Sequence, residues 1–152
     1  MTGKKIFATP QDVEAAFYEA LEKSDLDAMM AVWAEDEEII CVHPGGPRLV
    51  GYADIREAWR RIFDAGMRLH IRLGQQSTVT TPFAVVVSLI EHIQIKERGG
   101  VATGATTDTT APVAATNVYV RGALGWRMVA HHASAVPPNS LDAMSDAPKV
   151  LH

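Results

Sequence analysis

Residues 83–96 read FAVVVSLIEHIQIK, and this stretch decides the fold. Its β-branched residues predict one long β-strand. From Phe83 to Ile90 both alternating faces are apolar, which predicts that both sides of the sheet are covered there. The same apolar run is too short to cross a lipid bilayer.

Further strands are predicted on both sides of this stretch. They begin at Met67, Ala111 and Trp126. The connections are rich in glycine and small residues: residues 98–108 and 122–125. Strands linked in this way predict an antiparallel sheet, since hairpins reverse the chain direction.

Helical patterns occupy the N-terminal part of the chain. Thr9-Pro10-Gln11-Asp12 is a typical helix start, because Thr9 can cap free N–H groups and Pro10 suits the first turn. Apolar residues then recur at helical spacing in three groups, which begin at Val13, Leu26 and Ile55. A short strand at residues 38–42 and a turn at residues 43–47 separate the second and third groups.

Helices segregated from antiparallel strands predict an α+β domain. We expect a cone-shaped curved antiparallel sheet that encloses a pocket together with the three N-terminal helices. The expected boundaries are a single domain over residues 1–138 and a loose C-terminal tail over residues 139–152.

Composition narrows the possible partners and the compartment. The chain has 152 residues, of which 47% are hydrophobic, and a net charge of −4. The nearest approach to a basic cluster is Arg56, Arg60 and Arg61, which we interpret as a solvated helix face, so neither a nucleic-acid nor a membrane partner is expected. A single cysteine, Cys41, and the lack of a signal peptide predict a cytoplasmic protein.

Four stretches carry a resemblance to a known family. They are residues 24–33 (SDLDAMMAVW), His43-Pro44-Gly45-Gly46 with Leu49-Val50-Gly51, Ile55-Arg56-Glu57-Ala58-Trp59, and residues 125–134 (GWRMVAHHAS). The chain resembles the nuclear-transport-factor-2-like superfamily, in particular its SnoaL-like branch, which is related to ketosteroid isomerase. The resemblance implies a cone of three helices and a bent sheet. It also implies a homodimer packed through the outer faces of the sheet.

Glu91 is the most informative acidic residue. Counted by twos, it shares a face with apolar residues only: Phe83, Val85, Val87, Leu89, Ile93 and Ile95. Burial among them would raise the pKa of this carboxyl group and suit it to general acid or base catalysis near neutral pH. The alternative is a twist or bulge that turns Glu91 toward solvent or an arginine.

Histidines provide the other predicted catalytic groups. His132 alternates with Trp126, Met128 and Ala130, so we predict that His132 points into the cone and His131 points out. A core histidine bonded to a backbone carbonyl is the alternative. His43 opens the Pro-Gly-Gly turn, where it could face a ligand or only hold the turn in place.

Five residues are predicted to line the ligand pocket: Phe17, Trp33, Tyr52, Trp59 and Asn117. Asn117 alternates with apolar residues, and a buried amide needs a partner, either a ligand carbonyl or another strand. The aromatic residues could be ordinary core residues, and Tyr52 could be a surface tyrosine. His43, His132 and Glu91 would make a workable metal-ligand set, but their spacing does not enforce one, so we expect no metal.

Two hypotheses about function follow from these residues. The first is a cofactor-independent isomerase, cyclase or lyase that binds a small apolar or carbonyl-bearing molecule. In it Glu91 or His132 would move a proton, and Asn117 or His43 would hold the oxyanion. The second is a non-catalytic ligand-binding or dimerisation domain.

Overall fold

The fold was described from a computed structural model that defines residues 5–99, 101–102 and 111–137. These residues form three helices and seven strands. The helices are α1 (Pro10–Lys23), α2 (Leu26–Val32) and α3 (Tyr52–Asp64). The strands are β1 (Ile40–Val42), β2 (Arg48–Val50), β3 (Arg68–Thr80), β4 (Ala84–Arg98), β5 (Val101–Ala102), β6 (Val113–Gly122) and β7 (Gly125–Ala135). The predicted C-terminal tail and most of the predicted loop after β4 lie outside the described residues.

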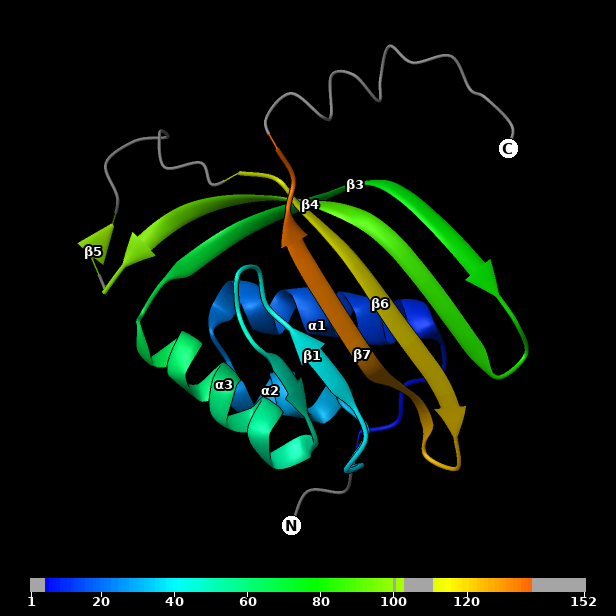
Figure 1. Ribbon diagram of the computed structural model, residues 1–152. Helices are drawn as coiled ribbons and strands as arrows, with labels where there is room; N and C mark the ends of the chain where they lie inside the picture. Colours follow the sequence, from blue (N-terminus) through cyan, green and yellow to red (C-terminus); the bar gives the residue numbers. More distant parts are fainter. Residues whose placement is uncertain (1–4, 100, 103–110, 138–152) are drawn as a thin grey trace, which may run out of the picture.

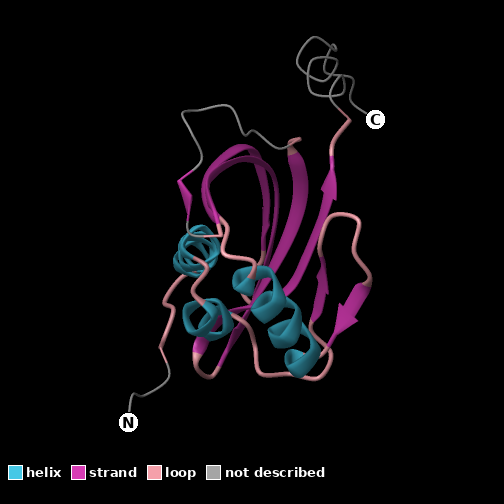
Figure 2. Cartoon of the chain, turned by 90° about the vertical axis from the view of Figure 1, so that its left-hand side faces the viewer, coloured by secondary structure: helices cyan, strands magenta, loops and turns pink. Residues whose placement is uncertain are grey.

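All strands belong to one curved sheet that bends over the helices (Figure 1). Its order is β2-β1-β7-β6-β4-β3, and β5 pairs with β4. The helices lie together on one side of this sheet, as the turned view in Figure 2 shows. The predicted α+β cone is therefore confirmed. The sheet is mixed rather than purely antiparallel, because β1 runs parallel to β7.

Local sequence explains where the first two helices begin. The Thr9 hydroxyl accepts a hydrogen bond from the Asp12 N–H at 3.1 Å and caps α1, as predicted. Asp25 caps α2, because its carboxylate accepts a hydrogen bond from the Ala28 N–H. Ser24 takes the left-handed conformation that ends α1 (φ 53°), which lets the chain turn sharply between the two helices.

The core fills the space between the helices and the concave side of the sheet. Its largest fully buried side chains include Phe17, Trp33, Trp59, Tyr119 and Met128. No helix among the described residues is long and apolar enough to span a membrane.

A β-bulge on β7 controls which side chains enter the core. Val118 pairs with Ala130, yet Tyr119 pairs with Met128, so Val129 is an extra residue on β7. Trp126 and Met128 point inward, as predicted, but after the bulge the inward positions are His131 and Ala133.

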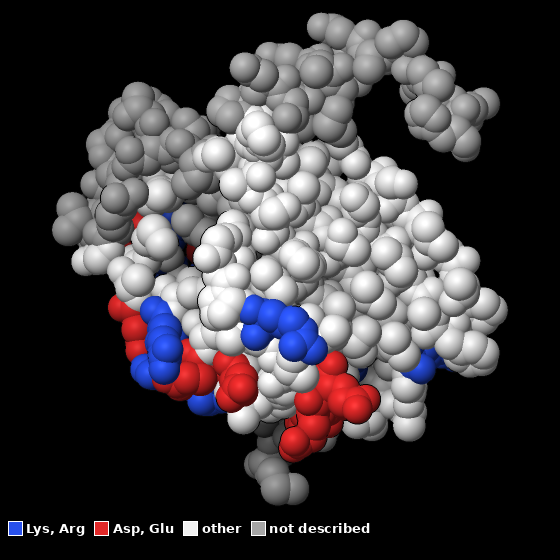
Figure 3. Space-filling model, viewed as in Figure 1, with Lys and Arg blue, Asp and Glu red and all other residues white. Residues whose placement is uncertain are grey.

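The outer face of the sheet carries few charges. Figure 3 shows a largely uncharged surface over β4 and β6, whereas charged side chains gather over α3 and the β1–β2 region. Exposed apolar side chains at or beside this face include Val79 (63% exposed) and Phe83 (67%). The doubly apolar start of β4 therefore has one face in the core, while parts of the other face remain accessible.

Candidate functional site

A carboxyl group lies in the interior of the cone. Glu91 on β4 is 3% exposed, and the Tyr18 hydroxyl of α1 donates a hydrogen bond to Glu91 Oε2 at 2.6 Å. Burial raises the pKa of Glu91 to about 7, because an ionised carboxylate loses hydration there, while the bond from Tyr18 acts in the opposite direction. Glu91 therefore changes its protonation state close to neutral pH.

The Tyr18 hydroxyl connects this carboxyl group to a buried amide. Asn117 on β6 is 0% exposed, and its Nδ2 group donates to the Tyr18 oxygen at 2.9 Å. Burial and the neighbouring Glu91 raise the pKa of Tyr18 far above its ordinary value, so the phenol keeps its proton. Sequence reasoning missed Tyr18, although it directly follows Phe17 of the apolar stripe on α1.

A histidine completes the chain of hydrogen bonds. His131 Nδ1 lies 2.5 Å from Asn117 Oδ1. The amide nitrogen faces Tyr18, so the amide oxygen faces His131 and only accepts. Nδ1 must then carry the hydrogen, and Nε2 carries the lone pair. Burial, reinforced by His43 and His132, lowers the pKa of His131 to about 3, so this imidazole is neutral at physiological pH.

Aromatic rings surround His131. Its ring centroid lies 4.9 Å from that of Phe17 and 6.4 Å from those of Trp59 and His43. His43, half-buried just after β1, packs edge-on against Trp59 at 4.5 Å, and burial lowers the pKa of His43. The Trp59 indole N–H is buried and has no hydrogen-bond partner among the described residues. The interior therefore contains one unused donor beside His131.

A second polar cluster lies one helical turn away on α1. Glu14 accepts hydrogen bonds from the Tyr119 hydroxyl at 3.2 Å and from Gln76 Nε2 at 3.1 Å. Burial raises the pKa of Glu14. Gln76 lies in a bulge of β3, where the neighbouring Gln75 has a φ of 51°. No pattern in the sequence indicated this cluster, because its members come from α1, β3 and β6.

The predicted inward orientation of His132 is wrong. His132 is exposed and His131 is buried (3% exposed), because the extra residue Val129 shifts the alternation of β7 by one. The hypothetical metal set with His43 and Glu91 is therefore not assembled. Among the described residues, no group of three or more His, Cys, Asp or Glu side chains is placed to hold a metal ion.

The remaining predicted residues divide between two places. Glu91, Asn117, Phe17, Trp59 and His43 gather in the interior around Tyr18 and His131. Trp33 and Tyr52 instead line a separate groove of about 660 Å³ between α2, α3 and the turn from β6 to β7.

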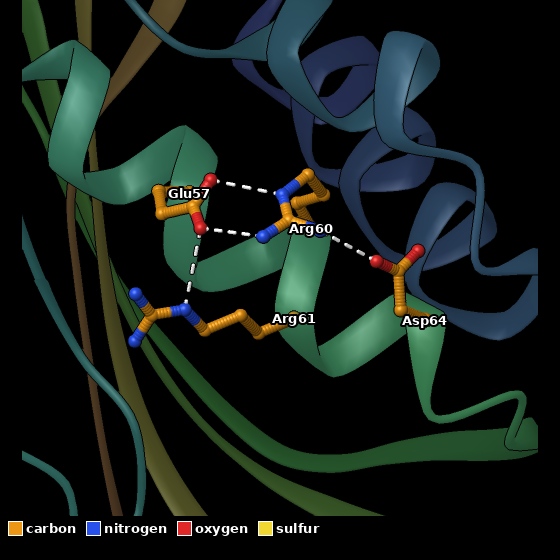
Figure 4. Close-up of polar contacts among 4 residues, drawn as sticks. All are labelled: Glu57, Arg60, Arg61 and Asp64. Atoms are coloured by element: carbon orange, nitrogen blue, oxygen red, sulfur yellow. Dashed lines mark hydrogen bonds and ion pairs between the residues drawn. The ribbon is translucent and has the colours of Figure 1, made fainter.

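The arginines of α3 form the expected solvated face. Arg60 contacts Glu57 at 2.6 Å and Asp64 at 2.7 Å, and Arg61 contacts Glu57 at 3.3 Å (Figure 4). These side chains are spaced three or four residues apart on one exposed helix surface. Arg56 takes no part in this cluster.

Comparison with known proteins places the chain among small cone-shaped domains. Residues 11–138 match the SnoaL-like domain family. A Thiobacillus denitrificans protein, provisionally named a calcium/calmodulin-dependent protein kinase type II association domain, is 37% identical, with a TM-score of 0.77 over 88% of this chain and 99% of that one. No curated protein sequence matches significantly.

Two further solved structures are similar. A Streptomyces avermitilis protein of the NTF2-like family, provisionally named a dehydratase, is 29% identical, with a TM-score of 0.69 over 82% of this chain and 91% of that one. An NTF2-like superfamily protein from Salmonella enterica is 17% identical with a TM-score of 0.69, over 83% of this chain and 87% of that one, and supports the fold alone.

Proposed function

The chain belongs to the family of SnoaL-like domains, and on this premise we propose that it is a cofactor-independent enzyme that moves a proton on a small, apolar, carbonyl-bearing molecule. The observation that carries the proposal is the buried chain of hydrogen bonds Glu91–Tyr18–Asn117–His131. Polar groups cost free energy when they are buried, so such a chain in a mostly apolar interior favours a role in chemistry over a role in packing.

The pKa values favour Glu91 as the group that transfers the proton. A general acid or base works best when its pKa lies near the working pH. Glu91, with a pKa of about 7, meets this condition, whereas His131, with a pKa of about 3, is too weak a base. We therefore assign the proton transfer to Glu91. His131 is a positioning residue, because its Nδ1–H fixes the orientation of the Asn117 amide.

One donor could hold the substrate oxygen. The buried Trp59 indole N–H has no partner among the described residues, whereas the Tyr18 hydroxyl donates its single hydrogen to Glu91. Ionised Glu91 would take a proton from the carbon next to the carbonyl, and the electron pair would move onto the oxygen, which the Trp59 N–H would stabilise. Return of the proton at another carbon gives isomerisation.

Partly buried apolar side chains lie beside Glu91 on the inner face of the sheet. Leu73 on β3 pairs with Glu91, and Ile71 pairs with Ile93. Leu73 and Ile93 are only half-buried, although they face the same side as the core. A ligand in contact with these side chains would reach the carboxyl group, and their apolar character favours an apolar substrate. The provisional name of the Streptomyces relative, a dehydratase, also fits proton-transfer chemistry.

Hydrogen–deuterium exchange on a carbonyl probe tests this proposal. The bicyclic ketone 2-decalone is incubated with the protein in D₂O, and loss of the α-proton signals is followed by NMR. We expect protein-dependent exchange with a rate that rises with pH through a midpoint near 7, as Glu91 ionises. Glu91→Gln should slow the protein-dependent exchange by about a hundredfold or more.

The exposed neighbour of His131 provides a matched control. His132→Asn should exchange the probe like the wild type, because His132 lies outside the interior. Equal rates for Glu91→Gln and the wild type would contradict the assignment to Glu91.

A second candidate function is association without catalysis. The Thiobacillus relative is provisionally named an association domain, and the outer face of the sheet is largely uncharged (Figure 3). A homodimer packed through this face would cover Val79, which is 63% exposed. Under this hypothesis the interior cluster would only bind a ligand or stabilise the fold.

Sedimentation at micromolar concentration tests the dimer. We expect a dimer that Val79→Lys weakens, because a charge would be buried in the interface. Ile6→Lys replaces an equally exposed apolar residue (68% exposed) that lies outside the strands and should leave the dimer intact. A wild-type monomer would contradict the proposed interface.

We also propose a cytoplasmic location. Cys41 is the only cysteine of the chain, and it is free and buried. Burial raises the pKa of its thiol to about 12, so it is an inert core residue. A protein without disulfides needs no oxidising compartment.

A further inference from the structure

The groove beside Trp33 is separate from the interior site. It has a volume of about 660 Å³, within the usual range for small-molecule sites. Its strand residues Val120 and Arg127 pair with each other, and they alternate with the inward-facing Tyr119 and Met128. The groove lies between α2, α3 and the turn from β6 to β7, and Glu91 is not among its lining residues.

Most charged groups of the groove already have partners. The Arg127 guanidinium donates to the backbone carbonyls of Lys5 and Trp126, and Glu35 favours its charged form. Lys5 lies over the Phe7 ring at 5.4 Å. The Asp36 carboxylate accepts the Glu38 N–H at 2.7 Å.

Two charged side chains in the lining have no partner among the described residues. Arg56 on α3 and Asp27 on α2 are both exposed, and neither has a hydrogen bond or ion pair within the described part of the chain. The contrast with Arg60 is informative: both arginines belong to α3, but only Arg60 is neutralised by acids on its own helix. One wall thus offers a free cation and another a free anion.

A buried aromatic side chain also lines the groove. Trp33 is 1% exposed, and its indole N–H has no hydrogen-bond partner among the described residues. A buried donor without a partner costs free energy. Trp33 and the neighbouring Met30 make this part of the groove apolar.

We infer that this groove binds a zwitterion of the aromatic amino-acid class, with Arg56 holding its carboxylate, Asp27 holding its ammonium group and Trp33 contacting its apolar body. A guanidinium binds a carboxylate through two parallel hydrogen bonds, and opposite charges on the two helices fix the direction of the ligand. A ligand with a single charge would leave one of the two groups without a partner.

Three related probes separate these contributions. L-tryptophan carries both charges, indole-3-propionate lacks the ammonium group, and tryptamine lacks the carboxylate. Binding is followed through the indole N–H resonances of the protein, of which the three tryptophans give one each. We expect L-tryptophan to shift the Trp33 resonance and to bind at least about tenfold more tightly than either singly charged probe.

Charge-removing variants then assign the two groups. Arg56→Gln should weaken the binding of L-tryptophan by about tenfold or more and leave the binding of tryptamine unchanged. Asp27→Asn should weaken the binding of L-tryptophan and leave the binding of indole-3-propionate unchanged. Arg60→Gln, on the same helix but outside the groove, is the matched control and should bind like the wild type.

Three results would overturn the inference. They are an unshifted Trp33 resonance at millimolar L-tryptophan, equal losses in Arg56→Gln and Arg60→Gln, and a shift of the interior Trp59 resonance without one of Trp33. The interior acid–base site is not needed for this binding, so Glu91→Gln should retain it.

Discussion

Two polar clusters of this protein have similar contact distances between their polar atoms but lie in different surroundings. On α3, Glu57, Arg60, Arg61 and Asp64 contact one another at 2.6–3.3 Å in water. In the core, the side chains of Tyr18, Glu91, Asn117 and His131 are buried and contact one another at 2.5–2.9 Å. Only the second cluster moves a carboxyl pKa to about 7. Burial, more than geometry, therefore decides which cluster can do chemistry and which one only covers a helix.

The largest expected difference concerns pH. The folded protein holds the pKa of Glu91 at about 7 against an ordinary value of 4.5, so its protonated form is favoured by folding. Its contribution to stability is complete below about pH 4.5 and is lost as the pH rises through about 7. His131 acts in the opposite sense, because its pKa falls from 6.5 to about 3: its contribution is present above about pH 6.5 and is lost as the pH falls toward 3.

Comparison of Glu91→Gln with the wild type isolates the first effect. The free energy of unfolding is measured with urea at a series of pH values. Between about pH 4.5 and pH 8, that of the wild type should fall by about 3 kcal/mol relative to that of the variant. Glu14 and His131 contribute to both proteins and cancel in the difference. A difference that does not change with pH would mean that Glu91 titrates like a surface carboxylate.

The next effect tests whether the interior hydrogen bonds support one another. Asn117→Leu removes the acceptor of the His131 Nδ1–H and the donor to Tyr18. A buried donor left without a partner should lower the free energy of unfolding by about 2 kcal/mol, measured by urea denaturation at pH 7. An unchanged free energy would show that water or a rearranged side chain replaces the amide.

The smallest effect belongs to the surface cluster. Arg60→Gln removes contacts to Glu57 and Asp64, which water replaces at an exposed site. We expect no change in the urea midpoint that can be distinguished from the wild type at 0.15 M salt. A loss comparable to that of Asn117→Leu would overturn the contrast between the two clusters.

Sequence periodicity predicted the cone and part of its interior. Alternation placed Glu91 and Asn117 among buried residues, because the first part of β4 and the inner positions of β6 pair without a bulge. The same rule failed for His132, because one extra residue at Val129 inverts every later position of β7. A bulge leaves no reliable mark in a single sequence, since Val129 suits a regular strand equally well.

Other features depended on contacts that are distant in the chain. Tyr18 contacts Glu91, 73 residues away in the sequence, and Asn117, 99 residues away, so no local sequence pattern indicates this network. The parallel pairing of β1 with β7 is equally remote in sequence. Local signals did locate the cap of α1, where Thr9 acts on a residue only three positions away.

A site-resolved titration of Glu91 tests the central claim most directly. The carboxyl carbon of Glu91, labelled with carbon-13, is followed by NMR as a function of pH in the wild-type protein. Burial beside Tyr18 predicts a midpoint at about 7. A midpoint near the ordinary value of 4.5 would contradict the account, because Glu91 would then be hydrated and unsuited to proton transfer near neutral pH.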